Sequence, residues 1–169
     1  MADTSEYLAH IQSLAAESDF LAAQREAPEL LAKFISGIAD AQLRQRPQPD
    51  KWSVGEIIAH LAEDELVTSW RYRQMLENNG VQLAGFDQDL WARASHYETW
   101  TPQDALTMFR LLREANLRLL DGLSPEDWQR HGIHAERGKI TIQNLARHMA
   151  GHDRNHLEQV RKILHSQGR

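Results

Sequence analysis

Apolar residues recur at steps of three and four along several long stretches of the chain. This spacing is typical of α-helices that bury one face, because residues three and four apart lie on the same side of a helix. The last stretch shows the pattern most clearly, and its inward-facing positions are Ile142, Leu145, Met149, His152, His156, Val160 and Ile163. Strand-like alternation of apolar and polar residues is absent. The sequence therefore predicts an all-α fold.

Helix-start signals divide the chain into its principal helices. Ser53 and Glu56 have the spacing of a capping box, in which the serine hydroxyl and the glutamate carboxylate each accept a backbone N–H. Thr101 and Thr141 stand in front of two further periodic stretches. Another helix is predicted to begin near Pro28, because proline is well suited to a first helical turn.

Four principal helices joined by long connections predict an antiparallel four-helix bundle, in which functional sites are built from facing helices. A shorter helical stretch is predicted from Ser5 to Ala16. The connection from Gly80 to Trp100 is rich in aromatic residues, which either plug one end of the bundle or form a lid over a site. No shift in composition divides the chain, so residues 1–169 are expected to form a single domain.

Composition narrows the class of protein. The 169-residue chain has a formal net charge of −5 and no basic stripe, so nucleic acid is not expected as a partner. No apolar run approaches the roughly 20 residues needed to span a bilayer, and no signal peptide is evident, so we expect a cytoplasmic protein without membrane contact. The absence of cysteine excludes disulfides, thiolate metal ligands and a cysteine nucleophile. Any sulfur chemistry would therefore need a thiol from outside.

Histidines within the last helix indicate a metal site. His148, His152 and His156 are four residues apart, and neutral imidazoles at that spacing can converge on one divalent transition metal. His152 and His156 fall within the inward-facing stripe, whereas His148 lies further toward the polar side. The alternative is a set of hydrogen-bonded core histidines, whose ring nitrogens each need a partner. Gly151, unfavourable inside a helix, would let a ligand or another backbone come close.

A third ligand is available from the helix that begins at Ser53. His60 lies in its second turn, beside an inward stripe that includes Asp64. Combined with His152 and His156, it makes a site of three histidines with one position left for water or substrate, which is the form of catalytic zinc sites. All-nitrogen ligation suits several divalent transition metals, of which we expect zinc or nickel.

Two segments in this order, KWSVGEIIAHLAEDE and HMAGHDRNHLEQVRKIL, resemble the DinB-like family of four-helix-bundle metalloproteins, which includes YfiT-type thiol transferases. The resemblance extends from about Pro28 to Leu164, and residues 1–27 are less securely covered. It implies an antiparallel bundle that binds a divalent metal through His60, His152 and His156, and frequently a homodimer. Family members described as enzymes mostly transfer low-molecular-weight thiols, so the resemblance also implies such a thiol as a cosubstrate.

Two kinds of function are open at this point. The first is a metal-dependent enzyme that transfers a thiol onto a small-molecule electrophile, with a metal-dependent hydrolase as a variant that uses water. Asp64 is the leading candidate to orient a histidine or move a proton, ahead of Asp153 and Glu63. The second is a non-catalytic stress-related protein that binds a metal or another ligand. The charged run from Arg71 to Arg73 is expected to be a solvated face, or else to bind a carboxylate-rich thiol.

Overall fold

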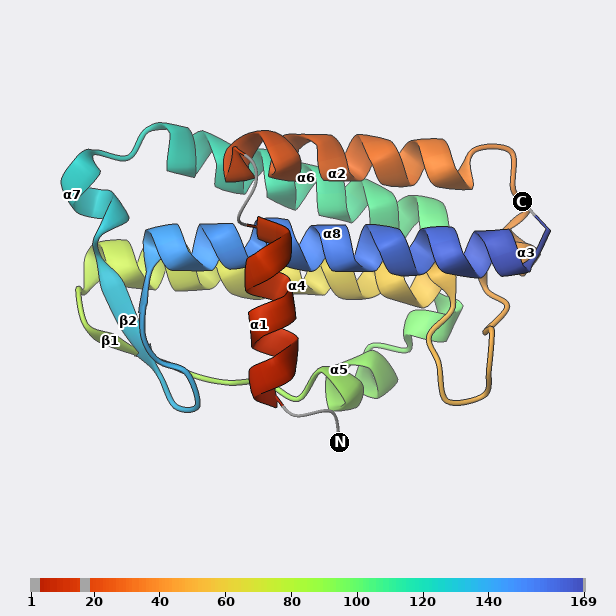
Figure 1. Cartoon of the computed structure of the whole chain (residues 1–169), viewed down its shortest axis with the longest axis horizontal. Helices are drawn as coiled ribbons and strands as arrows, with labels where there is room; N and C mark the ends of the chain where they lie inside the picture. The colour runs from red at the N-terminus through yellow and green to blue at the C-terminus, as the bar shows by residue number, and fades with distance from the viewer. Residues whose placement is uncertain (1–3, 16–18, 169) are drawn as a thin grey trace.

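Four long helices form the body of the molecule in a computed structural model that describes residues 4–15 and 19–168 (Figure 1). They are α2 (Phe20–Ile35), α4 (Val54–Glu77), α6 (Pro102–Asp121) and α8 (Ile142–Ser166). Helices α2 and α8 run in one direction along the bundle, and α4 and α6 run in the other. The predicted four-helix bundle is therefore confirmed. The connection between α4 and α6 travels back along the bundle, so these two neighbours are parallel to each other.

The predicted helix starts at Ser53, Thr101 and Thr141 are confirmed. The Ser53 hydroxyl oxygen accepts the Glu56 N–H at 3.2 Å, and the Glu56 carboxylate accepts the Ser53 N–H at 2.8 Å. The Thr101 and Thr141 hydroxyl oxygens each accept the N–H three residues further on, at 3.1 and 3.0 Å. Such caps satisfy backbone donors that have no partner inside the helix, so local sequence fixes where α4, α6 and α8 begin.

The predicted start of α2 near Pro28 is wrong. The helix begins at Phe20, and the Asp19 carboxylate caps it by accepting two backbone N–H groups. Pro28 lies in the helix interior, where it has no N–H to offer to the carbonyl oxygen of Gln24. Arg113 of α6 supplies the missing donor, with its Nη1 at 2.8 Å from that oxygen. A contact between distant residues therefore makes the proline tolerable, and the local sequence does not reveal it.

A short helix, α1 (Thr4–Ala15), lies across α8 in Figure 1. It matches the predicted stretch, apart from Ala16, which lies outside the described residues. A Cβ atom at Gly151 would lie only 2.1 Å from the carbonyl oxygen of Ile11. Arg154 of α8 also donates to the Leu14 carbonyl at 2.6 Å. The glycine in α8 thus allows the close approach of another backbone, which is one of the two roles its position predicts.

A small three-stranded sheet lies beside the end of the bundle where α4 ends and α8 begins (Figure 1). Its strands are β1 (Val81–Leu83), β2 (His131–His134) and β3 (Gly138–Thr141), with β2 in the centre. Strand β1 pairs with β2 in parallel, and β3 pairs with β2 in the antiparallel direction. Strands this short do not display an alternating pattern, so the all-α prediction missed them. Residues 135–137 form the turn between β2 and β3.

Four short helical segments complete the fold: α3 (Asp40–Leu43), α5 (Gln88–Ala94), the 3-10 turn at Tyr97–Thr99 and α7 (Pro125–Trp128). Tyr97 is buried against the rings of Trp52 and Trp100, and its hydroxyl donates to Glu63 at 2.7 Å. Part of the aromatic connection therefore plugs the bundle, as one of the two interpretations expects. No helix among the described residues is long and apolar enough to cross a bilayer.

Candidate metal centre

The structure brings His60, His152 and His156 together between two helices. His60 projects from α4, and the other two project from consecutive turns of α8. The Nε2 atom of His152 lies 3.2 Å from Nε2 of His60 and 3.1 Å from Nε2 of His156. All three side chains are buried, and one nitrogen from each falls within a group whose atoms lie within 4.8 Å of one another. Three imidazole nitrogens therefore converge on one point.

These imidazoles are held neutral. Burial, followed by the nearby His156, lowers the pKa of His60 to about 3. Burial also lowers the pKa of His156 to about 4 and that of His152 well below its usual value. A neutral imidazole carries the lone pair that binds a metal, so no proton has to be removed from these residues near neutral pH.

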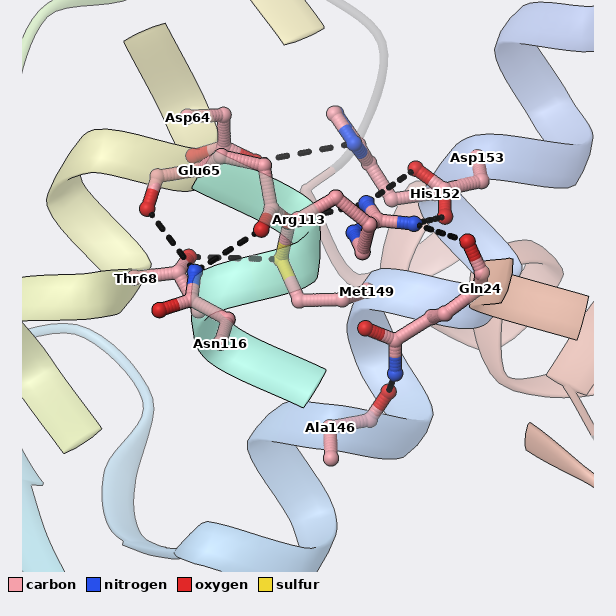
Figure 2. Close-up of polar contacts among 10 residues, drawn as sticks. All are labelled: Gln24, Asp64, Glu65, Thr68, Arg113, Asn116, Ala146, Met149, His152 and Asp153. Carbon is pink, nitrogen blue, oxygen red and sulfur yellow. Dashed lines mark hydrogen bonds and ion pairs between the residues drawn. The ribbon is translucent and has the colours of Figure 1, made fainter. Parts of the chain in front are cut away.

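The outer ring nitrogens face acceptors. His152 Nδ1 has no hydrogen-bond partner among the described residues, and the Asp64 carboxylate lies 3.5 Å from it (Figure 2). His156 Nδ1 lies 3.0 Å from the amide oxygen of Gln159. Protons on these Nδ1 atoms would leave both Nε2 lone pairs turned inward, which is how metal-binding histidines are usually oriented. The donor set, its neutrality and these acceptors together fit a divalent transition metal.

Asp64 is the one predicted orienting carboxylate that lies beside the histidines. Burial, and then the charge of Glu65, raises its pKa to about 7. Asp153 instead forms an ion pair with Arg113, with 2.6 Å between Oδ2 and Nη1 (Figure 2). Glu63 accepts hydrogen bonds from Ser95 and Tyr97 at the plugged end of the bundle. The structure thus separates Asp153 and Glu63 from the site.

His148 does not join the three nitrogens. Its ring stacks beside the ring of His152, with 6.1 Å between the ring centres, and it lines a cavity next to the cluster. His148 lies further round α8 than His152 and His156, as the sequence predicts, and its ring therefore does not reach the converging nitrogens. Among the described residues, no fourth histidine or carboxylate belongs to the converging group.

A pocket of about 600 Å³ reaches two of the three clustered histidines. His60, His152 and Asp64 line it, with Phe86 from the connection after β1. The remaining walls come from α1, the rest of the α4–α8 groove and the turn between β2 and β3. The aromatic connection therefore also contributes a wall beside the site, in addition to the plug at Tyr97. A small molecule in this pocket would contact the histidine cluster directly.

The same pocket contains two arginines that a sequence-based interpretation places elsewhere or overlooks. Arg71 is 7% exposed and its neighbour Tyr72 is buried. The predicted solvated face is therefore wrong for these two residues and correct only for Arg73, which is exposed. The sequence spacing indicates this placement, because Arg71 follows His60 by three helical turns and therefore faces the same side of α4. Arg137 lies in the turn between β2 and β3, where no local pattern indicates a role.

Relatives named as metal-dependent enzymes share most of the chain. A protein of Oceanobacillus iheyensis, whose name proposes a metal-dependent hydrolase, is 25% identical over 136 residues, which cover 80% of this chain and 78% of the relative. YfiT of Bacillus subtilis, also proposed to be a metal-dependent hydrolase, is 21% identical over 144 residues, covering 85% of this chain and 81% of YfiT.

Solved structures share the fold. The structure of YfiT, described as having an unusual four-helix bundle topology, matches with a TM-score of 0.82 at 20% identity, over 88% of this chain and 86% of YfiT. The crystal structure of the mycothiol-dependent maleylpyruvate isomerase matches with a TM-score of 0.67 at 12% identity, over 84% of this chain and 59% of the isomerase. The sequence profile of the DinB superfamily matches residues 23–160. With the bundle and the histidine cluster in place, the chain belongs to the DinB superfamily.

Proposed function

We propose that His60, His152 and His156 hold one divalent metal and that the chain is a metal-dependent enzyme acting on a small molecule. The observation that carries this proposal is the convergence of three neutral imidazole nitrogens at a pocket, without a fourth protein ligand among the described residues. Catalytic zinc sites have three protein ligands and one open position, whereas structural sites are closed by four. The arrangement therefore favours the enzyme over a purely structural metal.

Thiol S-transfer is the reaction that we favour. A divalent cation held by neutral ligands lowers the pKa of a thiol or water bound to it and so supplies a nucleophile near neutral pH. The chain itself has no cysteine, so the thiol would be a low-molecular-weight cosubstrate. The likeness in fold to a mycothiol-dependent isomerase supports this choice.

The residues of the chain have positioning roles in this reaction. The Asp64 carboxylate, 3.5 Å from His152 Nδ1, would orient that ring, and the amide oxygen of Gln159, 3.0 Å from His156 Nδ1, would orient the second ring. The ring of Trp52, 5.0 Å from that of His60, holds the third imidazole in place. The three histidines are buried, so the reacting atoms would lie in a region of low dielectric constant, where electrostatic interactions are stronger than in water.

A metal-dependent hydrolase is the second candidate. The names of the relatives from Oceanobacillus iheyensis and Bacillus subtilis support it. It requires the same three histidines, with water taking the position that the thiol would occupy. The two candidates therefore differ in the nucleophile and share the site.

Metal content tests the site. Protein purified without an affinity tag should contain about one equivalent of metal by elemental analysis, with zinc or nickel expected. The variants His60→Ala, His152→Ala and His156→Ala should each lose it. His148→Ala and His165→Ala, the latter exposed on the same helix, should retain it. Retention of metal by the His152 and His156 variants would refute the assignment.

Conjugation to monobromobimane tests the reaction. Metal-loaded protein should accelerate the attack of bacillithiol, mycothiol, glutathione or coenzyme A, and removal of the metal should abolish the acceleration. In this reaction the thiol sulfur bonds to the electrophilic carbon, bromide leaves with the bonding pair, and the thiol proton passes to solvent. If a metal-loaded protein accelerates none of these reactions, S-transfer is refuted and the hydrolase becomes the leading candidate.

A further inference from the structure

Arg71 is held at the wall of the pocket beside the histidines. Its Nη2 donates to the carbonyl oxygen of Ala84 at 2.7 Å, and its guanidinium carbon lies 5.9 Å from the centre of the Phe86 ring. These contacts fix the position of a side chain that is only 7% exposed. A guanidinium positioned in advance loses little conformational entropy when it binds a ligand.

This buried guanidinium has no carboxylate partner. Within residues 4–15 and 19–168, no carboxylate oxygen lies within 4.0 Å of a side-chain nitrogen of Arg71 or Arg137. The other deeply buried arginine, Arg113, is paired with both Glu65 and Asp153 (Figure 2). Buried charges are normally paired because removing an ion from water is costly. An unpaired guanidinium that lines a pocket therefore points to a partner from outside the chain.

Arg137 brings a second positive charge to the same pocket. It is partly buried in the turn between β2 and β3, with no hydrogen bond from its side chain among the described residues. Burial, and then the charge of Arg71, lowers the pKa of Arg137, so the two guanidiniums disfavour each other. An anion between them would relieve this repulsion. Arg137 also lines an adjoining cavity of about 770 Å³ with Lys139 and Arg147, which extends the basic surface.

Carboxylates in the same pocket do not pair with these arginines. Asp64 faces His152, and Asp87 caps α5 by accepting the N–H groups of Asp89 and Leu90. Glu136 also lines the pocket and is exposed. Burial lowers the pKa of both arginines, and the negative charge of Asp64 partly offsets this without an ion-pair contact, so the guanidinium N–H groups that Ala84 does not use are available to an oxyanion.

The pocket follows the groove between α4 and α8. His60 and His152 lie toward one end, Thr68 and Met149 contact each other further along, and Arg71 lies beyond them. Arg71 follows His60 by eleven residues in the same helix, which corresponds to about 16 Å along its axis. A molecule that contacts both ends is therefore elongated.

We propose that Arg71 and Arg137 bind an anionic oxygen group, either carboxylate or phosphate, of the molecule whose reactive end lies at the three histidines. The location of the reactive end rests on the proposed function. Guanidinium groups form paired hydrogen bonds with carboxylate and phosphate oxygens, which gives both affinity and orientation. The substrate or cosubstrate of this site is therefore an anion rather than a neutral molecule.

Anion titration by calorimetry tests the proposal on the metal-loaded protein. The probes are succinate and inorganic phosphate, with succinamide as the neutral counterpart of succinate. The variants are Arg71→Gln and Arg137→Gln, and the control is Arg73→Gln, an exposed residue of the same helix whose side chain bonds to Ser69. We expect binding of at least one anion, at least tenfold weaker in both pocket variants and unchanged in the control. Whichever of succinate and phosphate binds more tightly identifies the anionic group of the ligand as carboxylate or phosphate.

Two outcomes would overturn the proposal: succinamide binding as tightly as succinate, or a folded Arg137→Gln protein binding both anions as the wild type does. The Arg137 variant keeps the test decisive if Arg71→Gln fails to fold through loss of its bond to Ala84. An anion that binds only to the metal would be insensitive to either arginine and counts against the proposal. Metal content is measured on the same samples. Arginine-dependent anion binding without thiol conjugation would therefore refute the proposed reaction and leave the anion site standing.

Discussion

His152 turns its outer ring nitrogen toward the carboxylate of Asp64 across the interface between α8 and α4. The two atoms, Nδ1 and Oδ2, lie 3.5 Å apart, and both residues are buried. No hydrogen-bond partner of this nitrogen is found among the described residues, so Asp64 is the acceptor positioned to define which ring nitrogen carries the proton. A carboxylate behind a ligating histidine orients the ring and increases its basicity.

Asp64→Ala should therefore weaken metal binding by about 10- to 100-fold without abolishing it. Asp64→Asn retains an oxygen acceptor without the charge, so its loss should be smaller. Competition with a chromophoric chelator measures both affinities. Glu158→Ala, at an exposed carboxylate on α8, is the control and should match the wild type. Wild-type affinity in Asp64→Ala would show that this carboxylate does not support the site.

Acid should destabilise the metal-free protein through its buried histidines. Burial lowers the pKa values of His60 and His156 to about 3 and about 4, whereas the unfolded chain binds these protons near pH 6.5. Between these values the unfolded state binds more protons at these histidines, so the stability that they contribute is complete above pH 6.5 and falls as the pH decreases. At pH 5 the loss is up to about 2 kcal/mol for each of these histidines.

Urea unfolding of the metal-free protein at pH 7.5, 6.0 and 5.0 measures this loss. A His60→Phe variant has one fewer buried imidazole, so its stability should decline less between pH 7.5 and 5.0 than that of the wild type. His165→Phe replaces an exposed histidine of the same protein and serves as the control, whose decline should match that of the wild type. Equal declines in the wild type and in His60→Phe would contradict the interpretation that burial holds this imidazole neutral.

The features that could be predicted from the sequence are those set by interactions between residues close together in the chain. Ser53, Thr101 and Thr141 define helix starts through bonds to residues three positions away, and the structure contains each bond. His152 and His156 could be paired because a helix places residues four apart on one face. His60 could be added because its helix start was already fixed and because of the family resemblance.

Features that depend on distant contacts could not be predicted in this way. The interior position of Pro28 is tolerated through Arg113, which lies 85 residues further along the chain and has no local pattern that points to Gln24. The strands of the small sheet are too short to show alternation. Arg137 reaches the pocket only because the turn between β2 and β3 folds beside α8.

Arg113 should contribute strongly to the stability of the bundle. It lies 1% exposed between Glu65 and Asp153, so Arg113→Leu would leave two carboxylates buried without their cation. Loss of one partner from a buried ion pair typically costs about 3–5 kcal/mol. Arg110→Leu is the control, because Arg110 is partly exposed and pairs with the exposed Glu29, an interaction worth about 0–1 kcal/mol. Denaturant unfolding should separate the two variants, and equal stabilities would contradict this account.

Gly151→Ala tests whether α1 is docked on α8 through close backbone contact. In an isolated helix the change would stabilise by about 1 kcal/mol, because alanine favours helix more than glycine does. Here the new Cβ would lie 2.1 Å from the carbonyl oxygen of Ile11, a backbone atom that cannot rotate away. We therefore expect α1 to be displaced, with hydrogen exchange of its amides at least tenfold faster.

Gly55→Ala is the matched control for this substitution. It also adds a methyl group inside a long helix, α4, but its Cβ would meet no heavy atom closer than 3.4 Å. Its effect on the exchange of α1 should be negligible. Because Tyr7 of α1 lines the pocket, displacement of α1 in Gly151→Ala should also alter ligand access to the histidines while metal content stays unchanged. If the α1 amides of Gly151→Ala exchange as slowly as those of the wild type, then α1 does not depend on this glycine for its position across α8.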